Sequence, residues 1–155
     1  MPVYLDHAAT TPLRPEAIAA FTDALGLVGN PSSIHSQGQQ ARRMLEEARE
    51  AVASTLGCDP IEVVFTSGGT EAINLAVKGM FWARNAERAH PRILVPGGEH
   101  HATLDAVEWL ERADGATVDW LPLDSEGRVE ADAVRSGLAA PDDIALLTFL
   151  QVNNE

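Results

Sequence analysis

Residues Ser67-Gly68-Gly69-Thr70 combine glycines and hydroxyl groups in a short turn that suits an anion. The apolar run Val63–Phe65 precedes this turn, and apolar residues at helical spacing follow it from Ile73 to Met80. The pattern predicts a strand, a tight loop and a helix start. N–H groups at a helix start lack intrahelical acceptors and lie at the positive end of the helix dipole, so they attract phosphate. An ordinary connection with a threonine cap explains these residues equally well.

The same turn lacks the signatures of the common nucleotide-binding loops. It contains neither Gly-x-Gly-x-x-Gly nor Gly-Lys-Thr/Ser. If the turn binds a phosphate, we therefore expect a small phosphorylated cofactor rather than a dinucleotide or ATP.

A second group of residues capable of chemistry is Glu99-His100-His101, which follows two glycines. Neighbouring residues on a helix point in different directions, and no cysteine or suitably spaced histidine supplies further ligands, so we expect no metal site here. A histidine between a loop and a helix is most often a helix cap or a solvated surface group. A catalytic role for these histidines therefore depends on what the fold brings beside them.

Apolar runs and helical stripes alternate along the chain and predict the elements that position these residues. Five helices are expected. The first runs from Pro15 to about Leu25, the second from about residue 39 to 56, and the third begins after Thr70. The fourth follows Gly97–His101 and ends at about Arg112, and the fifth covers 131–138. Strands are expected at 63–65, 92–96, 116–121 and 143–150, most of them apolar enough to be buried on both faces. The alternation predicts an α/β fold with a largely parallel sheet and helices on both faces.

The carboxyl ends of parallel strands are where ligands bind in such sheets. Three segments follow predicted strands: Ser67–Thr70, Gly97–His101 and Gln151–Glu155. The fold is therefore expected to bring a phosphate loop, two histidines and two asparagine amides to one edge of the sheet.

The composition limits the function classes that this chain can serve. Its 155 residues, 45% of them hydrophobic, are expected to form a single domain with a core. The formal charge of −12 argues against DNA and anionic membranes as partners. No apolar run is long enough to cross a bilayer, and no basic secretion signal is evident. The single cysteine, Cys58, fits a reducing cytoplasm.

The chain resembles the cysteine desulfurases, pyridoxal-phosphate enzymes of the class V aminotransferase group, over essentially its whole length. Any one of the shared motifs would be weak evidence, but their occurrence in the family's order makes the match specific. The residues that carry the resemblance are Tyr4–Pro12, Gly29–Ser33, Phe65–Glu71, Asn74–Ala76, Glu99-His100 with Leu104-Asp105, and Val152–Glu155.

The resemblance implies roles for individual residues. In such enzymes the Gly-Thr of the central loop holds the cofactor phosphate, which here corresponds to Gly69 and Thr70. The histidine after the glutamate stacks on the pyridine ring and is a candidate for moving protons, which points to His100. The second asparagine of Asn-Asn-Glu, here Asn154, lies beside the phenolic oxygen of the ring and can donate a hydrogen bond to it.

The same resemblance implies an activity, a set of partners and a domain layout. The reaction is expected to convert L-cysteine to L-alanine and an enzyme-bound persulfide, with a sulfur-acceptor protein that serves iron–sulfur cluster assembly or tRNA thiolation. A homodimer is also expected. Residues 1–35 would form an N-terminal arm, helix and loop, and residues 36–155 the start of the cofactor-binding domain.

The sequence departs from the family at its catalytic centre. The Schiff-base lysine, the aspartate that pairs with the ring nitrogen and the nucleophilic cysteine lie downstream of Asn-Asn-Glu in the family, and this sequence stops before them. Lys78 and Cys58 match neither the lysine nor the cysteine, and we expect them to be a helix-surface residue and a turn residue. The chain alone is therefore expected to be inactive. The alternatives are a selenocysteine lyase, another class V enzyme, or a catalytically silent fragment that acts as a binding module.

Overall fold

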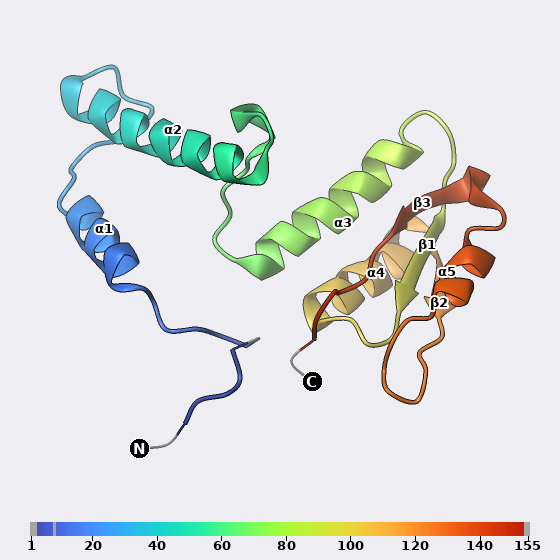
Figure 1. Cartoon of the computed structure of the whole chain (residues 1–155). Helices are drawn as coiled ribbons and strands as arrows, with labels where there is room; N and C mark the ends of the chain where they lie inside the picture. Colours follow the sequence, from blue (N-terminus) through green and yellow to red (C-terminus); the bar gives the residue numbers. More distant parts are fainter. Residues whose placement is uncertain (1–2, 8, 154–155) are drawn as a thin grey trace. The chain divides into compact units, whose positions relative to one another are not determined.

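The computed structural model describes residues 3–7 and 9–153, which belong to two compact units that divide between Phe65 and Thr66. The first unit contains α1 (Pro15–Leu25), α2 (Ser36–Leu56) and the short 3-10 helix η1 (Pro60–Glu62) (Figure 1). Proline opens α1 because the first helical N–H needs no partner. Gly57 ends α2 in the left-handed conformation, with φ of 71°. The single-domain organisation expected from the sequence stays a prediction.

The strand expected at 63–65 does not form in this structure, and that prediction was wrong. The segment is held instead by α2, because Arg49 donates a hydrogen bond to the Val63 carbonyl and places its guanidinium carbon 5.1 Å from the centre of the Phe65 ring. Val64 is 64% exposed. A strand needs a neighbour to satisfy its backbone groups, and within the described residues no strand pairs with this segment.

The second unit is a layered α/β structure, as the sequence predicts. Its sheet has three parallel strands in the order β2-β1-β3, so β1 pairs with both neighbours. Along the chain the elements are α3 (Gly69–Asn85), β1 (Arg92–Pro96), α4 (His101–Asp114), β2 (Thr117–Leu121), α5 (Ala131–Gly137), the 3-10 helix η2 (Pro141–Asp143) and β3 (Ile144–Leu147). The parallel order follows from the helical connections, which return each strand to the same end of the sheet.

Side chains of β1 alternate between two faces of the sheet, and each face has its own apolar core. Ile93 and Val95 are completely buried in the larger core, with Phe81 of α3 and Leu110 of α4. Leu94 points the other way and packs with Leu121 and Ile144, against which Val134 of α5 also packs. The predicted burial on both faces is confirmed for β1 and β3, whereas β2 is partly exposed and its Trp120 is 50% exposed. Among the described residues, no helix is long and apolar enough to cross a membrane.

Candidate functional site

The start of α3 offers unpaired backbone donors, as the sequence predicts for Ser67–Thr70. Gly68 is the N-cap residue, and the first backbone hydrogen bond of the helix runs from the Ala72 N–H to the Gly68 carbonyl over 3.1 Å. The N–H groups of Gly69, Thr70 and Glu71 precede that bond, so the helix supplies no acceptor for them. A Cβ atom placed on Gly68 or Gly69 would meet no atom within 4 Å, which shows that the space beside these glycines is open.

Glu71 orders this loop, a role that the sequence analysis did not assign. Its carboxylate accepts hydrogen bonds from the Ser67 hydroxyl, at 2.5 Å, and from the Ser67 N–H, at 2.7 Å. The bond from the hydroxyl, followed by that from the N–H, lowers the pKa of Glu71 below its ordinary value. The sequence signal for this residue is an acidic side chain in the first turn of a predicted helix.

His100 is the N-cap residue of α4, the first alternative weighed for it above. Its Nδ1 accepts a hydrogen bond from the Ala102 N–H over 3.0 Å. An accepting Nδ1 carries no proton, so the neutral ring has its proton on Nε2. His101 is the first residue of the helix and, like His100, is exposed. The two adjacent histidines therefore differ in role, because only His100 is fixed as a cap.

The starts of α3 and α4 lie at the same end of the second unit (Figure 1). The two helices run in the same direction, since Lys78 contacts Trp109 at 4.5 Å from the ring centre and Trp82 donates to Asp114 further along both helices. Trp82 and Asp114 are 32 residues apart in the sequence. Gly69 and His101, the first residues of the two helices, are separated by the same number of residues. The turn at 67–70 and the histidine pair therefore lie at the starts of two helices that run side by side in the same direction.

Two hydrogen bonds join the loop after β1 to the segment after β3. The Glu99 carboxylate accepts a bond from the Leu150 N–H, and the Asn153 side-chain amide donates to the Gly98 carbonyl over 2.8 Å. Glu99 is only 6% exposed. The predicted meeting of these segments is thereby confirmed. Asn154, the residue expected beside the cofactor ring, lies outside the described residues.

A hollow of about 220 Å³ lies against the His100 loop. Its lining comes from the loop after β1, the start of α4 and the segment after β3: Gly97, Gly98, Glu99, His100, His101, Leu104 and Asn153. The structure thus places both histidines and one asparagine of the predicted site around a single cavity.

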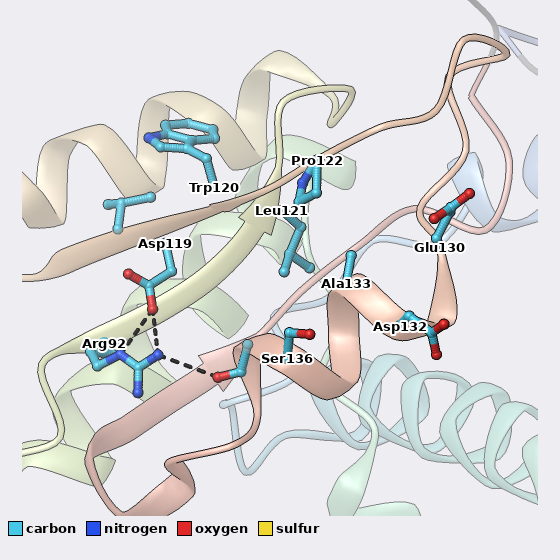
Figure 2. A pocket seen from close by; sticks show the side chains of 11 residues that line it. Arg92, Asp119, Trp120, Leu121, Pro122, Glu130, Asp132, Ala133 and Ser136 are labelled. Atoms are coloured by element: carbon cyan, nitrogen blue, oxygen red, sulfur yellow. Dashed lines mark hydrogen bonds and ion pairs between the residues drawn. The ribbon is translucent and has the colours of Figure 1, made fainter.

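A larger hollow of about 710 Å³ lies elsewhere, beside β2 and α5 (Figure 2). The guanidinium of Arg92 is already engaged there by Asp119, by Asp143 at 2.8 Å and by the carbonyls of Ala140 and Gly137. Its hydrogen bonds to Asp143 and Asp119 raise the pKa of Arg92 above its ordinary value. Arg92 opens β1, so its cation lies at the opposite end of that strand from the His100 loop. The cation is held by carboxylates and carbonyls and serves as a structural ion pair.

Four other residues with chemically active side chains, Asn30, His35, Cys58 and Lys78, lie in the first unit or on α3. Asn30 folds its own loop by accepting a hydrogen bond from the Ser32 N–H over 2.9 Å, and this loop, with His35, belongs to the first unit. Cys58 also belongs to the first unit. Lys78 is on α3 in contact with the Trp109 ring.

Comparison with known sequences gives a consistent match. The family model described as aminotransferase class-V matches residues 3–155. An IscS-like cysteine desulfurase of Mycobacterium tuberculosis is 52% identical over 153 residues, which cover 98% of this chain and 39% of the relative. A putative cysteine desulfurase IscS 1 of Bacillus subtilis is 43% identical over 154 residues, which again cover 39% of its length.

Solved structures agree with the sequence comparison. A NifS-like protein superposes with a TM-score of 0.83 at 32% identity and covers all of this chain, which corresponds to 42% of that protein. A structure of SspA in complex with cysteine superposes with a TM-score of 0.84 at 33% identity, covering 98% of this chain and 43% of that one. The chain spans about two fifths of the length of these relatives, and it belongs to the class V aminotransferase family of the cysteine desulfurases.

Proposed function

We propose that this chain forms the phosphate-binding and ring-stacking side of the cofactor site in a cysteine desulfurase that uses pyridoxal 5′-phosphate. The observation that carries the proposal is that α3 and α4, which begin at Gly69 and His101, run side by side in the same direction within the same unit. The proposed reaction takes sulfur from L-cysteine and leaves L-alanine and an enzyme-bound persulfide. The proposal includes a sulfur-acceptor protein and a homodimer.

The residues at the start of α3 fit the phosphate of this cofactor, which members of the family use. The donors are the N–H groups of Gly69 and Thr70 and the Thr70 hydroxyl, at the positive end of a helix of 17 residues. The open space beside Gly68 and Gly69 leaves room for the anion. The carboxylate of Glu71 is engaged by the hydroxyl and the N–H of Ser67, which orders the turn.

The residues around the His100 loop fit the ring. Because Nδ1 of His100 is held by the Ala102 N–H, the imidazole has a fixed attachment, and its Nε2 is the atom that would hold or release a proton. Asn154 would donate an amide N–H to the phenolic oxygen, a charge-assisted bond when that oxygen is ionised. When bound, the cofactor supplies the electron sink for breaking bonds in the amino-acid substrate.

Titration with pyridoxal phosphate, followed by absorbance, tests the phosphate site. Replacing Thr70→Val removes one hydrogen bond to a charged group, so we expect the affinity to fall by about ten- to a hundredfold. Thr117→Val is the matched control, because Thr117 opens β2 at the opposite end of the sheet. Equal affinities in the two variants would show that the turn is only structural.

The ring site is tested by asparagine substitutions at both histidines. Asparagine is itself a good N-cap residue, so His100→Asn retains the start of α4 while it removes the imidazole. In a full-length form of the protein, we expect His100→Asn to change the absorbance of bound cofactor and to slow turnover, and His101→Asn to change neither. The reverse ranking would overturn the assignment of His100.

A catalytically silent chain is the second candidate, because Lys78 is held against the Trp109 ring. An amine that attacks the cofactor has to be free and aimed at it, with a lowered pKa. We expect the 155-residue chain, supplied with pyridoxal phosphate and L-cysteine, to form no more alanine than free cofactor does. Alanine above that background that disappears with Lys78→Ala or Cys58→Ser would make the chain an enzyme in its own right.

A further inference from the structure

We propose that Glu99 is a positioning residue that sets the place of His100 relative to the segment after β3. The inference rests on the proposed function, because it concerns the same site. The structural unit involved, which we call the Glu99 latch, consists of Gly98 and Glu99 on one side and Leu150 and Asn153 on the other.

The burial of Glu99 is the first argument. A carboxylate is costly to remove from water unless hydrogen bonds replace its solvation. Glu99 is 6% exposed and its Oε1 receives the Leu150 N–H. In the described part of the chain, every fully buried side-chain nitrogen or oxygen has a hydrogen-bond partner. The carboxylate is thus part of the internal hydrogen-bonding of the unit and is not a solvated surface charge.

The path of the chain after β3 is the second argument. The Thr148 N–H still bonds to the Leu94 carbonyl of β1, over 3.0 Å, and so continues the pairing of the sheet. Two residues later the Leu150 N–H turns to the Glu99 carboxylate. Glu99 therefore takes over from β1 as the partner of this segment, and the placement of Asn153 depends on the loop after β1.

The position of the latch beside His100 is the third argument. Glu99 and Gly98 are held by the segment after β3, while the next residue, His100, is held on its other side by the Ala102 N–H. The Glu99 latch thus fixes the chain before His100, and the Ala102 N–H fixes its imidazole ring. Loss of the latch would leave only the second of these contacts. A ring that stacks on a cofactor needs both position and tilt to be defined, which one hydrogen bond does not achieve.

The latch also forms a wall between two hollows. Gly98, Glu99 and Asn153 line two cavities. One, of about 220 Å³, is also lined by His100 and His101, and the other, of about 370 Å³, is also lined by Phe149 and Leu150. Opening the latch would join the two spaces. We therefore expect its loss to affect the His100 side of the wall.

The experiment uses three variants without cofactor and then with it. Amide hydrogen exchange at Leu150 and the imidazole nitrogen resonances of His100 are measured by NMR in the wild type, Glu99→Ala, Glu99→Gln and the surface control Glu111→Ala. We expect Glu99→Ala to speed exchange at Leu150 by about ten- to a hundredfold, the factor that a charge-assisted hydrogen bond represents, and to shift and broaden the His100 resonances. Glu99→Gln keeps an acceptor oxygen and should restore both signals, whereas Glu111→Ala should resemble the wild type.

Pyridoxal phosphate is then added and its absorbance is recorded. We expect Glu99→Ala to change the absorbance of the bound cofactor and Glu99→Gln to return it toward the wild type. A role of Glu99 in stability alone would lower the midpoint of unfolding without moving the His100 resonances or the absorbance, and that result would overturn the inference. Rapid exchange at Leu150 in the wild type would overturn it as well, even if Glu99→Ala does not fold.

The two proposals fail separately in this design. A wild type that takes up no pyridoxal phosphate contradicts the proposed function, while the His100 resonances in the absence of cofactor still decide whether Glu99 positions that ring. A wild type that binds the cofactor, together with unchanged His100 signals in Glu99→Ala, contradicts only the role of Glu99.

Discussion

The two units contain similar helical sequences but differ in what those helices bury. In the second unit, α4 contributes Ala106, Val107 and Leu110 to a core formed with the sheet. In the first unit, α1 carries an apolar stripe of the same spacing but has no buried residue, and its Phe21 is 65% exposed. Apolar spacing therefore predicts that a helix forms, but it does not show that its apolar face has a partner.

The difference also explains where the candidate site lies. A site needs side chains held by rigid elements, and the second unit supplies these through parallel strands that end beside two helix starts. The loop of Asn30 and His35 lies in the unit without such a core. The contacts within the second unit therefore do not bear on whether this loop binds a ligand.

The largest expected effect compares one residue from each unit. Leu110 is completely buried, so Leu110→Ala should lower the free energy of unfolding by about 2–5 kcal/mol through lost contacts and a cavity. Phe21→Ala removes an exposed ring and should change it by no more than about 0.5 kcal/mol. Urea unfolding followed by tryptophan fluorescence reports the second unit, which contains all three tryptophans. A similar loss in both variants would show that α1 is packed in solution.

The same contrast shows which parts of the fold the sequence could predict. The strands at 92–96 and 144–147 were predictable because their apolar residues are continuous and are buried on both faces. The run Val63–Phe65 has the same character but no neighbour, so the prediction of a strand there failed. Strand formation depends on a partner that is distant in sequence, whereas a helix satisfies its own backbone.

Helix ends provide a second comparison, because both units use the same device. Gly57 ends α2 and Gly115 ends α4, each with φ of 71° and with open space where a Cβ would stand. Alanine in this left-handed conformation costs about 1–2 kcal/mol from the backbone alone. We expect Gly57→Ala and Gly115→Ala to increase amide exchange in the last turn of their own helices by similar factors. A much larger effect at Gly115 would show that the core of the second unit amplifies a local cost.

The candidate site divides between local and long-range features in the same way. The helix start at Gly69 and the cap at His100 were expected because glycines and a loop-to-helix boundary are visible in neighbouring residues. The role of Glu99 was not predictable, since its partner Leu150 lies 51 residues away and a glutamate gives no sequence sign of burial. The bond from Asn153 to Gly98 spans 55 residues; the meeting of the two segments was predicted, but this individual bond was not.

The smallest expected effect is a pH dependence confined to the start of α3. Because the hydroxyl and the N–H of Ser67 lower the pKa of Glu71 from its ordinary value of 4.5, the ionised carboxylate is favoured in the folded loop. The stabilisation it gives is therefore complete above pH 4.5 and is lost as the pH falls through the lower value in the folded state. We expect the Ser67 amide resonance to move and its exchange to quicken over that acidic range. Glu71→Gln should abolish this pH dependence, whereas Glu111→Gln should leave it intact. A Ser67 amide that titrates equally in Glu71→Gln would mean that another group senses the pH and that Glu71 does not order the turn.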